Sequence, residues 1–448
     1  MALVHPFRAY RYNPAVAPFE RVLTQPYDKI SPAMQEKYYA ADPHNLIAIE
    51  KGRTQQDDIP QDNVYTRAAA SLRSWIAENV VQQDPAPALY AYSQEYTVPG
   101  TTLLRTRRGF IGLGKLEDYS TGVIFRHEHT LSGPKADRLE LLRHTRTHTG
   151  QLFMLYSEPH LLVDAVLDEV TSSQPPITQM TDEYGVIHRL WMIAEPHRIA
   201  SIQKAMADQK LVIADGHHRY ETSLNFRNES RSRAGKLIPE APYEFSMMTF
   251  INTRREGLTI LPTHRVAANL RDYSWSGVRR YLEPWFATEV FPFSGEAQRQ
   301  EAVGKFLERL AAAKPQRAIG AYPAPETGSH AFYILTLRPE ADIAQILPGL
   351  SALQRELDVV LLHQGILEPA LGITPHAVAS EANLSYEREA SAALDAVDRG
   401  AAQIVFLLNP VDVDLVVQVA TAGEVMPQKS TDFYPKLLSG ITMYRIEE

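Results

Sequence analysis

The chain has 448 residues, which is too long for one ordinary hydrophobic core, so we expect two or three domains. Its 44% hydrophobic and 22% charged residues are typical of a globular protein in water, and its formal net charge of -8 argues against a general nucleic-acid binder. The absence of cysteine excludes disulfides, thiolate metal sites and a cysteine nucleophile.

These features favour a cytoplasmic protein. A reducing compartment suits a chain without cysteine. The N-terminal residues MALVHPFRAYRYNP lack the apolar core of a signal peptide, and no apolar run approaches the length of a membrane span. We therefore expect no membrane partner and disfavour nucleic acid as a ligand, while a homo-oligomer is compatible with the sequence.

Hydrophobic periodicity predicts alternating helices and strands. Residues 64–80 have apolar side chains at helical spacing, and residues 88–98 and 102–114 flank Pro99-Gly100, a hairpin signal. Pro134 is placed to begin a helix that runs to about His148. Further strands are expected at 151–156, 187–193, 211–214, 244–251, 317–322, 331–338 and 402–408. Further helices are expected at 197–208, 297–313, 355–367, 385–398 and 411–422.

This order of elements predicts an α+β protein with mixed sheets and helices. We divide the chain into three consecutive regions. They are an N-terminal α/β region at 1–125, a core at 126–270 that holds two polar motifs, and a C-terminal α/β region at 271–448.

The first polar motif is FRHEHTLSGPKADRLELL. Glu128 stands between His127 and His129, and a carboxylate beside histidines can serve as a general base. Lys135 and Arg138 follow near the expected start of a helix, where they could neutralise phosphate oxygens. The two histidines could also bind a metal, because alternate positions of a strand face one way. A polar loop with a helix cap explains the same residues equally well.

The second polar motif is LVIADGHHRYETSLNF, in which four apolar residues predict a buried strand that ends at Asp215. Gly216 lets the backbone approach a ligand closely, and the first N–H groups of the following helix favour an anion. Arg219, beside His217 and His218, could add a planar fork for a phosphate or a carboxylate. The structural alternative is a plain N-cap at Asp215 with solvated neighbours.

A third polar cluster lies near the end of the chain, in MPQKSTDFYPKLLSG. Lys429 and Lys436 could approach an anion, although the segment alone is typical of a packed loop. The segments QPYDKISP with Asp28, and LPTHRV with His264 and Arg265, are similar in kind. Each of them alone is more often structural.

Several segments together resemble a bacterial and archaeal family of unknown function whose hallmark is the DGHHRY motif. The resemblance covers nearly the whole chain, from about Pro6 to Gly440. The segments, in chain order, are PFRAYRYN, QPYDKISP, HEHTLSGPKADRLELL, ADGHHRYET, ILPTHR, LDVVLLHQGILEP and MPQKSTDFYPKLLSG.

The DGHHR core is similar to a motif of the ParB and sulfiredoxin superfamily, and within it to the free serine kinases, which phosphorylate serine with a nucleotide. The resemblance implies a ParB/sulfiredoxin-like core with additional α/β domains. It also implies a phosphate-binding motif from Asp215 to Arg219 and an upstream glutamate as base, for which Glu128 is the candidate. Sulfiredoxin chemistry itself is excluded because it needs a cysteine.

The leading hypothesis is therefore a nucleotide-dependent phosphotransferase that acts on a small hydroxyl metabolite, with serine or a serine-like compound as substrate. Glu128 or Asp215 would accept the hydroxyl proton. ATP or ADP is the nucleotide that the resemblance implies, with Mg²⁺ as its usual counterion. The residues expected to bind the nucleotide are Gly216, His217, His218, Arg219, Lys135, Arg138 and Lys429.

Two alternatives stay open at this point. A non-catalytic nucleotide or phosphate sensor with a regulatory role would need the same phosphate-binding residues but no base. A metal-dependent hydrolase would use His127, His129, His217 and His218, although the chain has no helical H-E-x-x-H motif.

Overall fold

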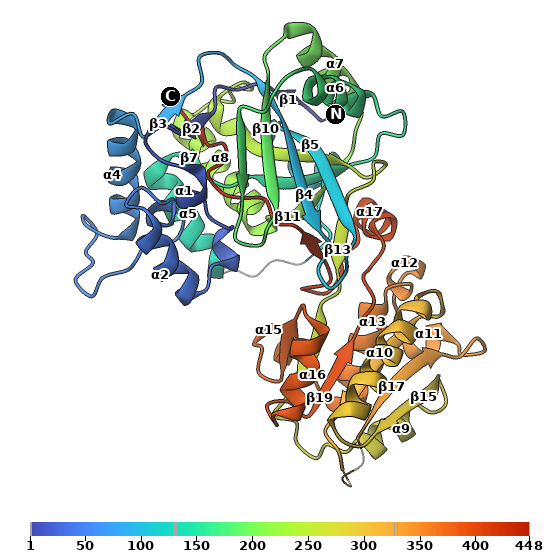
Figure 1. Cartoon of the computed structure of the whole chain (residues 1–448). Coiled ribbons are helices and arrows are strands. Elements are labelled where there is room, and N and C mark those ends of the chain that lie inside the picture. The colour runs from blue at the N-terminus through green and yellow to red at the C-terminus, as the bar shows by residue number, and fades with distance from the viewer. Residues whose placement is uncertain (1, 129–132, 327, 329, 448) are drawn as a thin grey trace. The chain divides into compact units, whose positions relative to one another are not determined.

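The computed structural model describes residues 2–128, 133–326, 328 and 330–447. The chain forms two compact units (Figure 1). Unit 1 comprises Met1–Thr259 and Phe433–Glu448, and unit 2 comprises Ile260–Asp432. Both units contain helices and sheets, so the predicted α+β class is confirmed.

Unit 1 is built on a nine-stranded sheet. Its strands are β1 (Val4–His5), β4 (Leu89–Thr97), β5 (Leu104–Lys115), β6 (Ile124–Phe125), β8 (Leu152–Tyr156), β9 (Thr178–Thr181), β10 (Ile187–Ile193), β11 (Leu211–Asp215) and β12 (Phe245–Asn252). The order is β6-β11-β8-β12-β5-β4-β10-β9, with β1 paired to β5. The sheet is mixed, because β11 runs parallel to β6 and antiparallel to β8, while β8 runs parallel to β12.

Eight helices of unit 1 have described bounds. They are α1 (Phe19–Val22), α2 (Pro32–Ala41), α3 (Ile47–Glu50), α4 (Val64–Ala77), α5 (Gly133–Thr145), α6 (Leu162–Ser173), α7 (Pro196–Met206) and α8 (His217–Ala234). Local sequence explains several of their starts. Asn63 and Thr66 form a capping box at α4, and Pro196 occupies the first turn of α7.

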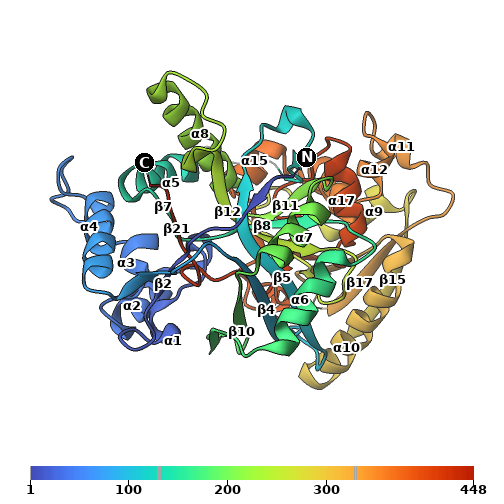
Figure 2. The ribbon, with the colours of Figure 1, turned by 90° about the horizontal axis from the view of Figure 1, so that it is seen from above.

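The main core of unit 1 lies between one face of the sheet and helices α6, α7 and α8 (Figure 2). Leu167 of α6, Ile202 of α7 and Tyr220 of α8 belong to one buried cluster with strand residues such as Met154 and Phe250. Side chains alternate along a strand, so the neighbours of these strand residues face the opposite side. That second face carries polar side chains and receives the end of the chain.

The C-terminal segment, residues 433–447, is held against this second face by a buried arginine. Arg107 of β5 is 1% exposed and donates hydrogen bonds to the carbonyls of Tyr434 and Pro435. Gln94, the partner of Arg107 on β4, donates to the carbonyl of Lys436 at 2.8 Å. Further along, β21 (Tyr444–Arg445) pairs with β7 (Thr147–His148), as Figure 2 shows. The short strands β2 (Tyr10–Tyr12) and β3 (Val81–Gln83) form a separate pair.

Unit 2 contains a six-stranded antiparallel sheet of order β15-β17-β16-β19-β14-β18. These strands are β14 (His264–Ala267), β15 (Phe286–Phe293), β16 (Ala318–Pro323), β17 (His330–Leu337), β18 (Leu384–Glu387) and β19 (Ile404–Leu407). Phe306 and Leu394 come from the two helices that share a buried cluster with Phe332 and Leu407 of the sheet.

The helices of unit 2 are α9 (Trp275–Leu282), α10 (Glu296–Ala312), α11 (Ile343–Ile346), α12 (Ala352–Arg355), α13 (Asp358–Leu362), α14 (Glu368–Leu371), α15 (Pro375–Ala379), α16 (Ala390–Asp398) and α17 (Val413–Thr421). Strands β13 (Thr259–Leu261) and β20 (Asp432–Tyr434) span the two positions where the chain passes from one unit to the other.

Most of the predicted elements are present, with three informative differences. The helix expected to reach His148 ends at Thr145, because the next residues pair with the C-terminal segment as β7. The stretch 355–367 is broken into short helices and a π-turn, and the stretch 385–398 begins as strand β18 before α16.

The division into two units differs from the three consecutive regions at 1–125, 126–270 and 271–448. Strand β5 pairs along its length with β12, so the expected boundary at residue 125 would cut through one sheet. The boundary near residue 270 falls at Thr259 instead, and the last residues return to unit 1.

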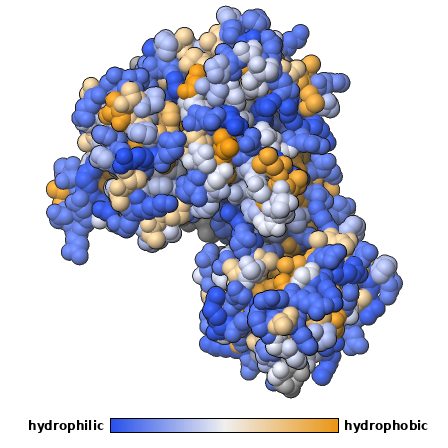
Figure 3. Space-filling view, viewed as in Figure 1, coloured by the Kyte–Doolittle hydropathy of each residue, from blue (hydrophilic) through white to orange (hydrophobic). Residues whose placement is uncertain are grey.

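Among the described residues, no helix is both long enough and apolar enough to cross a membrane. The face seen in Figure 3 is mainly hydrophilic, with separate apolar patches.

We expect Arg107→Met to destabilise unit 1 by about 2–4 kcal/mol, because it removes a buried cation and leaves carbonyl acceptors unpaired. Urea unfolding measures the loss, and hydrogen exchange should show faster exchange at residues 434–440. The exposed Arg73 of α4 provides a control substitution, Arg73→Met, that should change neither measurement. Unchanged protection of residues 434–440 in Arg107→Met would contradict this role.

Candidate functional site

The site is organised by the turn between β11 and α8, which we call the β11–α8 turn and define as residues 215–219. Gly216 adopts the left-handed conformation, with φ of 92°. A Cβ atom on Gly216 would lie 3.2 Å from the Arg219 guanidinium and 3.2 Å from Leu152 Cδ2. Glycine is therefore required both by conformation and by space. The turn leads into an 18-residue helix, whose first N–H groups favour an anion.

Asp215 lies at the end of β11 among cations from distant parts of the chain. Its Oδ1 accepts a hydrogen bond from the Gly216 backbone N–H at 2.9 Å, and its Oδ2 lies 3.4 Å from Lys436 Nζ. Burial alone would raise the pKa of this carboxyl. Lys436, Arg219 and Lys29 outweigh burial and hold the pKa of Asp215 well below its usual range. Asp215 is therefore ionised at neutral pH.

Arg138 lies over the ring of Tyr27, and the charge of Arg219 also acts on this tyrosine. Arg219 Nη1 donates to the carbonyl of Gln151 at 2.5 Å. The Arg138 guanidinium carbon lies 4.4 Å from the centroid of the Tyr27 ring, in a cation–π contact. Burial raises the pKa of Tyr27 to about 12, while the charges of Arg219 and Arg138 oppose that rise. Two guanidinium groups thus share one small region with the short helix that contains Lys29 (Tyr27–Lys29).

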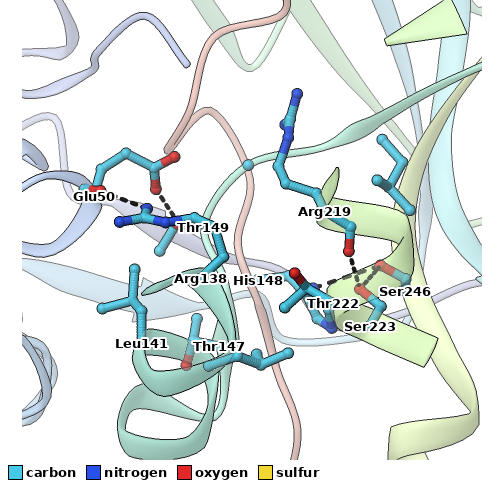
Figure 4. Close-up of a pocket in the computed structure, with 13 residues that line it drawn as sticks. Glu50, Arg138, Leu141, Thr147, His148, Thr149, Arg219, Thr222, Ser223 and Ser246 are labelled. Carbon is cyan, nitrogen blue, oxygen red and sulfur yellow. Dashed lines mark hydrogen bonds between the residues drawn. The ribbon is translucent and has the colours of Figure 1, made fainter. Parts of the chain in front are cut away.

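A small pocket adjoins this region, and we call it the Glu50 pocket (Figure 4). Glu50 is 3% exposed and accepts hydrogen bonds from the hydroxyls of Thr149 and Ser439. Arg138 donates to the Glu50 carbonyl at 2.6 Å. The pocket measures about 50 Å³, against roughly 300–1,000 Å³ for sites that hold drug-sized ligands. Its lining residues are Glu50, Arg138, Leu141, Leu142, Thr147, His148, Thr149, Gly150, Leu152, Arg219, Thr222, Ser223 and Ser246.

His127 and His217 pack against each other, with ring centroids 4.7 Å apart. The His127 Nδ1–H donates to the Ile213 carbonyl at 2.6 Å, and the His127 backbone N–H donates to His217 Nε2 at 3.5 Å. Burial lowers the pKa of both imidazoles, so both are neutral at pH 7. His127 Nε2 lies 3.8 Å from Oε1 of Glu128, the next residue in the chain.

The histidines give little support to a metal site. One nitrogen of each ring is already used in the contacts above. In the described ranges, no group of three or more histidine, aspartate or glutamate side chains is arranged to hold a metal ion. His129, which the hydrolase hypothesis also needs, lies outside the described residues.

The remaining predicted residues lie in three different surroundings. His218 occupies the second position of α8, at the turn itself. Lys135 of α5 pairs with Glu221, one turn further along α8. Lys429 belongs to unit 2, where its carbonyl accepts from Arg265 Nη2 at 3.1 Å. The lysine of that segment that meets Asp215 is Lys436.

Four residues of this region, Tyr27, Lys29, Glu50 and Gln151, are not among the predicted site residues. The segment QPYDKISP contains Lys29, but its polar character in the sequence points to Asp28. Glu50 lies in no recognisable motif, and Gln151 contributes only a backbone carbonyl to Arg219. Neither of these two gives a signal in the sequence.

Unit 1 thus combines an α+β fold with a glycine turn that has several cations around it. The chain belongs to the family described as "Protein of unknown function (DUF1015)", whose model matches residues 4–360. None of the curated proteins matches it.

Several solved structures resemble the chain at low identity. A conserved hypothetical protein from Pyrococcus furiosus has 12% identity and a TM-score of 0.31, over 70% of this chain and 89% of that one. A free serine kinase in complex with AMP has 10% identity and a TM-score of 0.34, over 72% and 88%. SbnI with a C-terminal truncation from Staphylococcus aureus has 11% identity and a TM-score of 0.32, over 73% and 85%. TM-scores this low do not establish a shared fold, so the ParB/sulfiredoxin-like core stays a prediction.

The depressed pKa of Asp215 predicts a pH-dependent effect on stability. Asp215→Asn should lower the free energy of unfolding by about 3 kcal/mol at pH 7, because it breaks a largely buried ion pair. A carboxyl whose pKa is lowered by folding stabilises above its unfolded pKa, about 3.9, and loses that contribution as the pH falls through its folded pKa.

The difference between wild type and Asp215→Asn should therefore be constant from pH 8 to about 5 and shrink below about 4. Urea unfolding at a series of pH values measures it. The exposed Glu256 supplies the control Glu256→Gln, which should stay close to wild type throughout. A difference that grew on acidification would contradict the ion-pair assignment.

Proposed function

We propose that the β11–α8 turn binds the phosphate groups of a nucleotide, ATP or ADP, and that the protein transfers a phosphoryl group to a small hydroxyl metabolite. The observation that carries the proposal is the charge at the turn. Lys29, Arg219 and Lys436 all act on the carboxylate of Asp215, beside a glycine at a helix start. A helix start with several cations around it is suited to bind a phosphate group.

The Glu50 pocket suits the second substrate. Its lining contains charges of both signs, from Glu50 and from the guanidinium groups of Arg138 and Arg219, together with five hydroxyl side chains and one imidazole. Arginine pairs with carboxylates, and a buried carboxylate pairs with an ammonium group. A small zwitterion with a hydroxyl group, such as serine, matches this pattern, whereas a nucleotide exceeds the volume of the pocket.

Of the two carboxylates predicted to act as base, Glu128 and Asp215, Glu128 is the better candidate. A general base works best when its pKa lies near the working pH, and the cations around Asp215 hold its pKa far below that. In the proposed step the substrate hydroxyl oxygen attacks the terminal phosphorus of the nucleotide. The bond from that phosphorus to the bridging oxygen breaks, and the hydroxyl proton passes to Glu128. Lys436 and Arg219 offset the charge that develops on the phosphate oxygens.

The described residues do not form a resident Mg²⁺ site. Asp215 Oδ1 already accepts the Gly216 N–H, and its other oxygen faces the Lys436 ammonium group. Mg²⁺ commonly reaches such sites bound to substrate phosphates. It therefore enters this proposal only as part of a metal–nucleotide substrate, and no step passes through it.

One observation favours a sensor as the second candidate. Lys436 lies three residues after Phe433, where the chain returns from unit 2 to unit 1. A ligand that engages Lys436 is thus connected to unit 2 through a very short segment. Such a coupling needs the phosphate-binding residues but no base.

We expect Arg219→Ala to weaken binding of ADP by about 1.5–3 kcal/mol, the range for a hydrogen bond to a charged group. Isothermal titration calorimetry with ADP measures the change. Arg73→Ala, on the exposed face of α4, is the matched control and should bind as wild type does. Equal ADP affinity in Arg219→Ala and wild type would remove the turn from the nucleotide site.

Glu128→Gln should reduce the rate of transfer by about 10²–10⁴-fold, the usual loss for a positioned general base. Its ADP affinity should change much less, since an amide keeps the shape of the side chain. The assay follows labelled phosphate from ATP or ADP to serine and to a panel of hydroxyl metabolites. Full activity in Glu128→Gln would exclude Glu128 as base, and tight nucleotide binding by wild type without any transfer would favour the sensor.

A further inference from the structure

A second and larger pocket lies entirely within unit 2, and we call it the unit 2 pocket. Its volume is about 430 Å³, compared with about 50 Å³ for the Glu50 pocket. That is within the roughly 300–1,000 Å³ of sites that hold small molecules. It lies where β14 and β19 meet the starts of α13 and α17, and it shares no residue with the β11–α8 turn or the Glu50 pocket.

Arg317 is the most informative side chain of this pocket. Its Nη2 is buried and has no hydrogen-bond partner among the residues that the structure describes. Its Nε lies 3.5 Å from Asp358 Oδ1, at the limit of hydrogen bonding. Arg317 also has a φ of 57°, as the left-handed cap of the short helix Lys314–Gln316. A guanidinium group with a buried, unpaired donor is suited to a planar anion.

The deep part of the pocket contains a second, fully used guanidinium group. Arg265 is 1% exposed and donates to His363 Nε2 at 3.2 Å and to the Lys429 carbonyl at 3.1 Å. Burial lowers the pKa of His363 to about 3, so the imidazole is neutral and accepts this bond. Arg265 therefore adds a fixed positive charge to the deep end.

Asp358 gives the pocket a negative charge beside that positive end. Burial raises its pKa to about 6, against the opposing charge of Arg317, so the carboxyl is still mostly ionised at pH 7. Nearer the surface, Lys314 Nζ and Asp412 Oδ1 form an exposed pair at 2.6 Å. The remaining lining includes Leu357, Leu408 and Leu415 with proline and valine side chains, and also the polar residues Thr263, Glu356, Asn409 and Ser430.

We propose that the unit 2 pocket binds an α-amino acid with an apolar side chain. In an α-amino acid the carboxylate and the ammonium group are attached to one carbon, and the pocket holds the opposite charges of Arg317 and Asp358 next to each other, with 3.5 Å between Nε and Oδ1. The carboxylate would face the Arg317 guanidinium group, the ammonium group would face Asp358, and the side chain would cover the leucines. This inference does not depend on the proposed function, because all these residues lie in unit 2.

The test uses the full chain and three probes, namely leucine and two analogues that each lack one of its two charged groups. Leucine carries both charges, 4-methylpentanoate lacks the ammonium group, and 3-methylbutylamine lacks the carboxylate. Calorimetry should show that leucine binds and that each of the other two binds more weakly by about tenfold or more. Hydrogen exchange with leucine present should slow at residues 356–360 and 408–416, which identifies the pocket.

Variants separate this pocket from the site in unit 1. Arg317→Met should weaken leucine binding by about tenfold or more, whereas the exposed Arg399→Met should leave it unchanged. Circular dichroism confirms that each variant is folded.

Three results would overturn the inference. They are no binding of leucine at about 10 mM, equal affinity for leucine and 4-methylpentanoate, or leucine binding that survives Arg317→Met. The probe comparison needs no variant, so it decides the matter even where a substitution disturbs folding.

Discussion

Unit 1 depends on one buried cation, the guanidinium group of Arg107. Burial lowers its pKa to about 10, which still leaves it charged at neutral pH. A charge inside a sheet is tolerated only when its donors are satisfied, and here Gln94 and the carbonyls of Tyr434 and Pro435 satisfy them. The same hydrogen bonds fix the C-terminal segment against the sheet. Lys436 follows directly in that segment, so the position of a site residue is coupled to the core.

The charges at the β11–α8 turn are harder to explain by stability alone. Asp215 needs one cation to be neutralised, yet Lys436, Arg219 and Lys29 all act on it. Gathering like charges costs free energy, and proteins depart from local consistency in this way mostly at functional sites. A bound anion would remove the repulsion. This gathering of cations is thus the physical link between the fold of unit 1 and the phosphate-binding role proposed for it.

The sequence pattern predicted those parts of the fold and of the site that are formed by residues close to one another in the chain. The hairpin at Pro99-Gly100, strand β10 and the strand–glycine–helix order around Gly216 all follow from neighbours in the sequence. Lys29 and Glu50 could not be found in this way, because the sheet and the returning C-terminus bring them to the turn. The return of the C-terminal segment to unit 1 is also not visible in the sequence. For this reason the predicted domain boundaries differ from the two units, and Lys429 rather than Lys436 is among the predicted site residues.

The central claim is that the cation-rich turn holds the phosphates of a nucleotide. A crystal structure of the full chain grown with ADP tests this most directly. The account predicts a phosphate group within hydrogen-bonding distance of the backbone N–H groups of residues 216–219, with the Lys436 ammonium group or the Arg219 guanidinium group in contact with it. ADP bound elsewhere, with the β11–α8 turn unoccupied, would contradict the account.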